Sequence, residues 1–320
     1  MCTYNGARFV GEQLASIAAQ TVLPTELIVC DDHSTDQTVD LLERFATDAP
    51  FPVRINVNPN NLGIIKNFER AIGLCTGELI ALCDQDDVWK AHKLERLAAE
   101  FARAPEVGLI FSDAELIDEN SHSIGRTLWK SIGVRYGNQK LSQGQALKEL
   151  LAGSTVTGAT TAFRSRFKSL VLPIPDNLLI IHDGWLALTI GAVATISALA
   201  EPLVKYRQHR DQEVGARARI ESETGVRTAL KRPNPYLETL AILHMLRQRL
   251  DASRNSFDVS DTITDLDRWI AHVEARAALP KGLLRVRSVL KELFALRYHR
   301  YSSGTYSAIK DLLGVIKRLF

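Results

Sequence analysis

An α/β fold with a mixed, mainly parallel sheet and flanking helices is predicted by three features of this 320-residue sequence. Short apolar runs alternate with amphipathic segments over the first 112 residues, which is typical of strands joined by crossover helices. The runs that end at Cys30, Cys83 and Phe111 stop abruptly before polar or acidic residues. From Tyr236 onward, Leu, Ile and Ala recur at helical spacing, which predicts a helical extension after the α/β part.

The individual elements follow from the spacing of apolar residues. Helices are expected where these recur every three or four positions, over residues 9–19, 65–74, 93–103 and 145–151. Further helices are expected after a capping box formed by Ser34 and Gln37, and from His182. Strands are expected over short apolar runs, at residues 27–30, 53–57, 79–83, 107–111 and 204–207.

The first six residues have the composition of a strand end followed by a loop. In an α/β unit the helix over residues 9–19 should follow a complete strand that pairs centrally in the sheet. We therefore expect the first strand to be truncated and the true start to lie upstream.

The net charge of +2 conceals an uneven distribution. Residues 201–320 hold 22 Lys/Arg against 14 Asp/Glu, a net charge of +8, whereas the first 200 residues hold 17 against 23, a net charge of −6. Residues 306–320 form a basic amphipathic stretch, which suits either the surface of an anionic membrane or docking on a neighbouring domain or subunit. Aromatic and basic residues do not interleave as in nucleic-acid modules, so no nucleic acid is expected.

Cysteine usage and hydropathy indicate the compartment. The four cysteines show no C-x-x-C spacing, so buried free thiols in a reducing cytoplasm are expected. The longest uncharged stretch, residues 184–200, is shorter than the roughly 18 residues of a membrane span. It is interpreted as a buried helix followed by a strand.

The most informative segment is the acidic one that follows the predicted strand 79–83. Asp84 and Asp86 lie on the same side of an extended backbone, because side chains alternate with period 2, and Asp87 follows directly. Mn²⁺ or Mg²⁺ takes one or two carboxylates and fills its remaining positions with water and phosphate oxygens. The segment therefore predicts a metal and diphosphate site; the alternative is a solvated acidic turn before the next helix.

Several motifs occur in one order along residues 1–215: Thr3-Tyr4-Asn5-Gly6, Asp31-Asp32-His33-Ser34-Thr35-Asp36, Asn61-Leu62-Gly63, Asp84-Gln85-Asp86-Asp87-Val88-Trp89, Thr157-Gly158, His182-Asp183-Gly184-Trp185 and Tyr206-Arg207-Gln208-His209. This ordered set resembles the family 2 inverting glycosyltransferases of GT-A fold. Within that family it is most similar to the bacterial rhamnosyltransferase-like members of surface polysaccharide biosynthesis. His33 departs from the pattern, since the family most often has Gly there, and a left-handed backbone would cost His more than Gly.

The resemblance implies a nucleotide site at the first strand ends. Asp31 and Asp32 are expected at the nucleobase, where a carboxylate accepts the N3–H of uracil or thymine. The alternative is that these carboxylates only supply negative charge at the N-terminus of the helix that follows. The other residues expected to contact the nucleotide are Thr3, Tyr4, Lys66, Asn67 and Asp84.

The resemblance also implies the metal ligands and the reacting groups. Asp86 is expected to bind Mn²⁺ or Mg²⁺ most directly, with Asp84 and His209 completing the site. Asp183 is the expected general base, since an inverting transfer needs a carboxylate to take the proton of the acceptor hydroxyl; its alternative role is a helix N-cap. The residues expected beside the acceptor are Thr157, Gly158, His182 and Trp185, the last of which alternatively fills the core.

Together these inferences predict a catalytic domain over residues 1–215, a linker over 216–235 and a basic helical extension over 236–320. The predicted activity is metal-dependent transfer of a sugar, with rhamnose as the first choice, from a UDP- or dTDP-sugar to a hydroxyl of a glycan or lipid-linked acceptor. We expect this to take place in the cytoplasm, with peripheral attachment to the inner face of the cell membrane. The alternative is a catalytically silent nucleotide-binding or scaffold protein of the same fold.

Overall fold

The first three strands form a parallel sheet. The computed structural model describes residues 1–320 except 135–136, 152–155, 179, 211, 213–234 and 315–320. The strands pair in the order β1 (Cys2–Thr3), β2 (Leu27–Asp31) and β3 (Val53–Val57). The helices that alternate with them are α1 (Val10–Ala18), α2 (Thr38–Asp48) and α3 (Ile64–Leu74). This alternation confirms the predicted crossover pattern, and β2 is buried along its whole length.

A second, mixed sheet continues from the first. Its strand order is β4 (Leu79–Ala81), β9 (Thr161–Arg164), β6 (Val107–Ile117), β10 (Thr195–Arg207) and β5 (Val88–Trp89). Two short strands extend it: β7 (Ser123–Thr127) pairs with β6, and β8 (Gln139–Leu141) pairs with β10. The long β6–β10 pair is parallel and the other pairs are antiparallel. A main-chain hydrogen bond from Cys2 to Cys83, 3.2 Å long, links β1 to the chain just after β4.

Helices cover the second sheet, and one of them is central to the core. They are α4 (Lys93–Arg103), α5 (Leu128–Ser131), α6 (Gln143–Leu151), α7 (Lys168–Val171) and α8 (His182–Gly191), with 3₁₀ turns η1 (Gly158–Thr160) and η2 (Ser165–Phe167). Most residues of α8 are buried, and β10 begins four residues after it. This confirms the interpretation of residues 184–200 as a helix and a strand. Within the described chain, every helix is too short or too polar to cross a bilayer.

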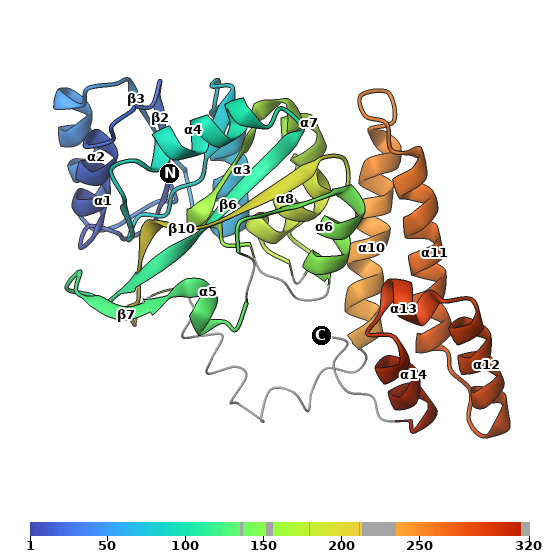
Figure 1. Ribbon diagram of the computed structural model, residues 1–320. Helices are drawn as coiled ribbons and strands as arrows, with labels where there is room; N and C mark the ends of the chain where they lie inside the picture. Colours follow the sequence, from blue (N-terminus) through green and yellow to red (C-terminus); the bar gives the residue numbers. More distant parts are fainter. Residues whose placement is uncertain (135–136, 152–155, 179, 211, 213–234, 315–320) are drawn as a thin grey trace.

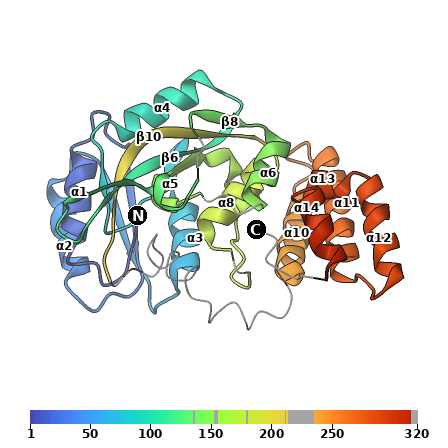
Figure 2. The same ribbon diagram turned by 60° about the horizontal axis from the view of Figure 1, so that its bottom comes forward.

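The C-terminal helices lie at the end of the molecule away from α1 and α2, as Figures 1 and 2 both show. They are α10 (Pro235–Ala252), α11 (Ser260–Ala277), α12 (Leu283–Phe294), α13 (Arg297–Tyr301) and α14 (Thr305–Leu312). Buried residues of α10 and α11 belong to the same hydrophobic core as the α/β part. Phe257, between these helices, stacks on Phe167 at 5.6 Å, so α10 and α11 are docked on the α/β domain.

Several details differ from the sequence-based expectations. The predicted capping box of Ser34 and Gln37 is wrong, because α2 has no side-chain cap and the Ser34 hydroxyl donates to Asp31 at 2.6 Å. Strand β6 is longer than predicted, and the β7 and β8 pairings were not foreseen. Most of the expected linker 216–235 and the end of the basic stretch 306–320 lie outside the described residues. The four cysteines are free thiols, three of them buried, as expected.

Candidate functional site

Carboxylates from distant segments come together at the strand ends. Asp84 follows β4, and Asp183 lies in the first turn of α8. Desolvation first, and then the charges of Asp86 and Asp183, raise the pKa of Asp84 to about 7. Burial first, and then the charges of Asp87 and these three aspartates, raise the pKa of the nearby Tyr206. The chain therefore concentrates negative charge at the place where the sequence predicted a cation and a diphosphate.

His209 lies against the acidic loop. Its Nε2 is 2.8 Å from Oδ2 of Asp86, and its ring packs on Phe9 at 4.7 Å between centroids. Its Nδ1 is buried, and no hydrogen-bond partner for this atom occurs among the described residues. The structure thus brings Asp86 and His209, two of the three predicted metal ligands, into direct contact.

The donor atoms fit a small divalent ion. Neighbouring ligands of an octahedral ion with bonds of about 2.1 Å lie roughly 3 Å apart, close to the separation of Asp86 and His209. The excess of carboxylates around Asp84 also favours a cation. Over the described ranges, however, no three or more His, Cys, Asp or Glu side chains are gathered as a complete metal site.

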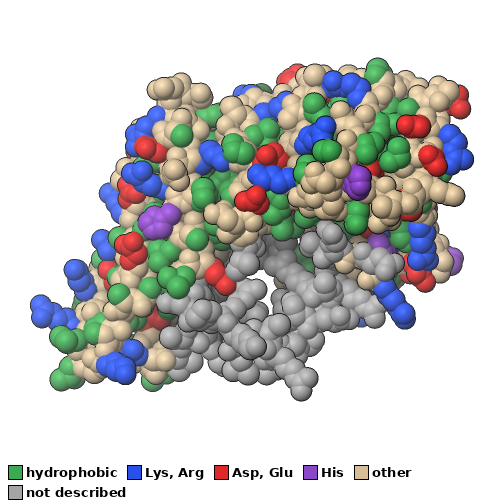
Figure 3. Space-filling model, turned by 180° about the vertical axis from the view of Figure 1, so that it is seen from behind, with side chains coloured by type: hydrophobic (Ala, Val, Ile, Leu, Met, Phe, Trp, Pro, Cys, Tyr) green, Lys and Arg blue, Asp and Glu red, His purple; other side chains and the backbone are tan. Residues whose placement is uncertain are grey.

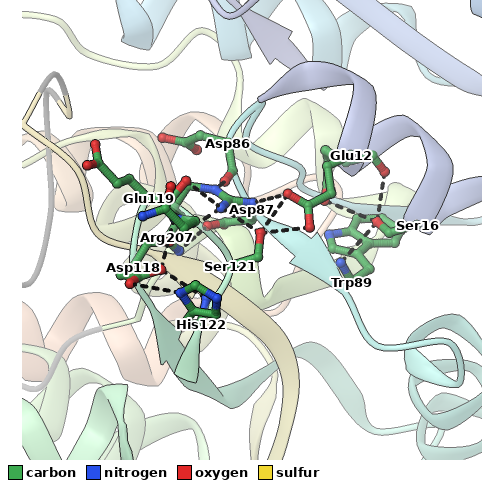
Figure 4. Close-up of polar contacts among 12 residues, drawn as sticks. Glu12, Ser16, Asp86, Asp87, Trp89, Asp118, Glu119, Ser121, His122 and Arg207 are labelled. Atoms are coloured by element: carbon green, nitrogen blue, oxygen red, sulfur yellow. Dashed lines mark hydrogen bonds and ion pairs between the residues drawn. The ribbon is translucent and has the colours of Figure 1, made fainter. Parts of the chain in front are cut away.

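Arg207, at the end of β10, holds the acidic loop in place (Figure 4). Its Nε donates to the main-chain carbonyl of Asp86 at 2.6 Å, and its main-chain N–H donates to Asp87 at 3.0 Å. The same guanidinium donates to Glu12 of α1 at 2.5 Å and to Ser121 at 2.9 Å. Arg207 is 1% exposed, although its partner Glu12 is partly in contact with water, and its bonds fix the direction of the loop.

Gln85 joins the acidic loop to the loop after β1. Its side-chain amide accepts from the main-chain N–H of Tyr4 at 2.8 Å and donates to the Tyr4 carbonyl at 3.0 Å. A Cβ at Gly6 would lie 2.1 Å from the end of the Gln85 side chain, so a larger residue at position 6 would have to displace the Gln85 amide from Tyr4. Tyr4 itself is exposed, which leaves its ring accessible to a ligand.

Asp31 and Asp32 are buried, and their carboxylates accept hydrogen bonds from the surrounding loops. Asp31 accepts from the hydroxyls of Thr3 at 2.7 Å and Ser34 at 2.6 Å. Asp32 accepts from the side chain of Asn58 at 2.7 Å and from two main-chain N–H groups of the 61–63 turn. These bonds hold the strand-end loops together. Direct contact of either carboxylate, or of Thr3, with a nucleobase stays a prediction.

Lys66 and Asn67 of α3 are also engaged within the protein. Lys66 forms an ion pair with Glu69 at 3.0 Å and donates to the carbonyl of Ile174 at 3.0 Å. Asn67 is buried, and its amide donates to the carbonyl of Cys30 at 2.9 Å. Both side chains are therefore bonded to other parts of the protein. Their predicted contact with the ribose or phosphate stays a prediction.

The predicted base lies beside the predicted acceptor segment. Oδ2 of Asp183 accepts from the main-chain N–H of Gly158 at 3.1 Å, and Oδ1 accepts from Gly184 at 2.6 Å. Thr157 precedes Gly158 in an extended conformation. Two main-chain donors thus orient the Asp183 carboxylate next to Gly158, within electrostatic reach of Asp84.

His182 and Trp185 lie deeper. His182 is 3% exposed, stacks on Phe68 at 3.9 Å, and neither of its ring nitrogens has a hydrogen-bond partner in the described part of the chain. Burial lowers its pKa, so the ring is neutral near pH 7. A Cβ on Gly158 would lie 3.0 Å from its Nε2. Trp185 is completely buried and donates to the carbonyl of Val171 at 2.9 Å, which matches the core-packing alternative.

Gln85 and Arg207 belong to the motifs in the sequence, but no role was predicted for either side chain. A signal was present for Arg207, since an arginine at the end of the predicted strand 204–207 must pair with acceptors if it is buried. No sequence signal identified Gln85, because its partner Tyr4 is 81 residues away and contributes only main-chain atoms.

Comparisons with known proteins identify the family of this chain. The model of the family described as glycosyl transferase family 2 matches residues 1–168. An uncharacterized glycosyltransferase of Nostoc sp. is 29% identical over 79% of this chain and 77% of its own. The dTDP-rhamnosyl transferase RfbG of Shigella flexneri is 26% identical over 68% of this chain and 74% of its own.

The fold agrees as well. TarS 1-349 of S. aureus, solved in complex with UDP-GlcNAc, superposes with a TM-score of 0.58 at 16% identity, covering 93% of this chain and 81% of that one. This likeness confirms the predicted GT-A fold. The structure brings carboxylates together at the strand ends, and the family model matches more than half of this chain. This chain therefore belongs to glycosyl transferase family 2 and is a glycosyltransferase.

Proposed function

We propose that this glycosyltransferase moves a sugar from a UDP- or dTDP-sugar to a hydroxyl of a glycan or lipid-linked acceptor, with inversion at the anomeric carbon. The observation that carries the proposal is the position of Asp183. Its carboxylate is oriented by Gly158 and lies close enough to Asp84 to raise the pKa of that group. A base beside a diphosphate site is what direct displacement requires.

Asp183 takes the proton of the acceptor hydroxyl as its oxygen attacks the anomeric carbon. The bond from that carbon to the diphosphate oxygen breaks on the opposite face, and the nucleoside diphosphate leaves. The neutral ring of His182 is buried behind Gly158 with both nitrogens unpaired in the described structure, so its predicted hydrogen bond to an acceptor hydroxyl would require the ring to become exposed. Thr157 and Gly158 line the acceptor side, where Gly permits close approach.

Asp86, Asp84 and His209 would hold Mn²⁺ or Mg²⁺. When bound, the ion offsets the charge that builds up on the departing diphosphate. The contact between Asp86 and His209 supports this ligand set, and the internal bonds of Gln85 and Arg207 keep the loop that carries it in position.

The donor sugar is proposed from the printed name of one relative. RfbG is named a dTDP-rhamnosyl transferase, which supports dTDP-rhamnose as the donor here. A surface polysaccharide is proposed as the product on the resemblance of the motifs alone. The place of reaction is proposed to be the cytoplasm, with attachment to the inner face of the cell membrane, where lipid-linked acceptors are available.

The test is a screen of donors for release of nucleoside diphosphate. The protein is incubated with Mn²⁺ and, in turn, dTDP-rhamnose, UDP-glucose, UDP-N-acetylglucosamine and GDP-mannose, while thermal stability is recorded with and without EDTA. Release from dTDP-rhamnose, together with metal-dependent stabilisation by dTDP, is expected, because a ligand that binds only the folded state stabilises it. Nucleotide binding without release from any donor would favour the silent alternative.

A further inference from the structure

One face of the C-terminal helices is both apolar and exposed. Ten of the seventeen large hydrophobic residues exposed in the described chain lie between Leu283 and Leu313. Four of them form the α12 stripe, defined here as Leu283, Val286, Leu290 and Phe294. Their spacing of three, four and four residues places them on one side of the helix. Leu283 is 89% exposed and Phe294 is 81% exposed, so they contribute little to the fold itself.

The charges around this face have one sign. Arg287 and Lys291 are exposed beside the α12 stripe, and neither forms an ion pair with another described residue. The only acids in residues 281–314 are Glu292 and Asp311. Both are buried and paired internally, Glu292 with His272 at 2.8 Å and Asp311 with Arg276 at 2.7 Å.

The outer surface of this segment therefore combines hydrophobic side chains with positive charge and presents no exposed acid in its described residues. Figure 3 shows hydrophobic and basic side chains side by side at the end of the molecule formed by these helices. A second exposed set follows on α14 and directly after it, where Tyr306, Ile309 and Leu313 are more than half exposed.

We propose that the α12 stripe, with Arg287 and Lys291, binds the surface of an anionic lipid membrane. Apolar side chains that enter the headgroup region, flanked by Lys and Arg that meet acidic headgroups, are the features of helices that lie in a membrane interface. An isologous contact with a second copy is disfavoured, because it would bring like charges of two copies together. The inference rests on the proposed location at the membrane, and it assigns that attachment to α12 in addition to the basic stretch 306–320.

The test is sedimentation of the full chain with vesicles of phosphatidylcholine alone and of phosphatidylcholine with phosphatidylglycerol. Binding is expected only to the anionic vesicles and is expected to weaken with salt. Arg287→Gln with Lys291→Gln should weaken it roughly 30-fold, since each basic residue near an anionic surface contributes about fivefold. Leu283→Ser with Phe294→Ser should remove it without lowering the melting temperature, because both side chains are exposed.

Matched controls use exposed residues of the α/β part. Val22→Ser with Leu23→Ser removes two exposed apolar side chains there, and Arg126→Gln removes an exposed charge; both variants should bind vesicles like the parent. No sedimentation with anionic vesicles, or equal sedimentation of parent and α12 variants, overturns the proposal. A dimer that Phe294→Ser converts to monomers in analytical ultracentrifugation overturns it in favour of a second copy. Release of nucleoside diphosphate is measured without vesicles, so the test of the transferase activity is independent of the test of membrane binding.

Discussion

Arg207 donates from its guanidinium Nε to the main-chain carbonyl of Asp86 at 2.6 Å, and it lies two residues before His209. Asp86 and His209 are themselves 2.8 Å apart. One buried arginine therefore fixes the backbone on both sides of the proposed metal site. The site is assembled by an interaction between residues 121 positions apart in the sequence.

Arg207→Lys is expected to lower the free energy of unfolding by about 3 kcal/mol, because the three donors of an ammonium sit on one nitrogen and cannot reach all the acceptors that the five donors of the guanidinium reach, which leaves acceptors unpaired. The affinity for UDP or dTDP with Mn²⁺ should fall as well, while the affinity without metal changes little. Urea denaturation and titration calorimetry measure the two effects. Arg8→Lys, at an exposed ion pair with Glu119, is the matched control and should cost under about 1 kcal/mol.

Asp183→Asn should leave nucleotide affinity near that of the parent and lower turnover by roughly 10²- to 10⁴-fold, the usual range for loss of a general base. The amide keeps the size of the side chain but cannot take a proton. The measurement is product formation under donor saturation. Asp48→Asn, an exposed position at the end of α2, controls for removal of one carboxylate. A variant that turns over at nearly the parent rate would exclude Asp183 as the base.

Much of the architecture was accessible from the sequence, because strands and helices of the α/β part have strong apolar periodicity. The strand 53–57 and the helix 93–103 were predicted with their exact limits. The motif order also identified the family. What could not be predicted depends on long-range partners: the Ser34 hydroxyl was assigned to a helix cap, whereas Asp31 receives its hydrogen bond.

The burial of some predicted ligand-binding residues also depends on long-range partners and could not be predicted. A lone sequence does not distinguish an indole that stacks on a sugar from one that packs in the core, and Trp185 is completely buried because α8 is surrounded on most sides. Asn67 likewise turns inward, where its amide donates to the carbonyl of Cys30 in the buried strand β2.

Asp86→Ala is expected to abolish the metal-dependent part of nucleotide binding, and His209→Ala to weaken it, because both side chains belong to the proposed ligand set. Calorimetric titration of Mn²⁺ into protein with UDP or dTDP present measures this without any turnover. Asp48→Ala serves as the control. If Asp86→Ala binds the metal–nucleotide pair as tightly as the parent does, the metal assignment is wrong.

His33→Gly should be more stable than His33→Ala by about 1 kcal/mol. His33 has a φ of +67°, as the departure from the glycine of the motif suggested, and an L-residue pays for this left-handed backbone. Both variants lose the 3.3 Å contact of the imidazole with the carbonyl of Asn58, so their difference reports the backbone alone. At Ala99, exposed on helix α4, Gly should instead be less stable by about 1 kcal/mol. Thermal or urea unfolding of the three variants decides whether the order reverses.

The C-terminal helices are expected to lose stability as the pH falls below about 6.5. Burial lowers the pKa of His272 from its ordinary value of 6.5, despite the opposing effect of its contact with Glu292. Between the lowered value and 6.5 the unfolded chain binds more protons than the folded one, so acid favours unfolding. The stabilising contribution of neutral His272 is therefore present above pH 6.5 and is lost as the pH drops through that range.

Amide hydrogen exchange of peptides from α11, α12 and α13 measures this directly, because His272 of α11 contacts Glu292 of α12 and lies 3.0 Å from Ser302, just after α13. Protection of these peptides, measured relative to the intrinsic chemical exchange rate at each pH, should fall between pH 6.5 and 5. His244→Gln removes an exposed imidazole and should leave this pH dependence intact, whereas His272→Gln should flatten it. Equal pH dependence in parent and His272→Gln would show that another group is responsible. The buried pair of Arg276 and Asp311 would then be examined next, since it joins α11 to α14 in the same interior.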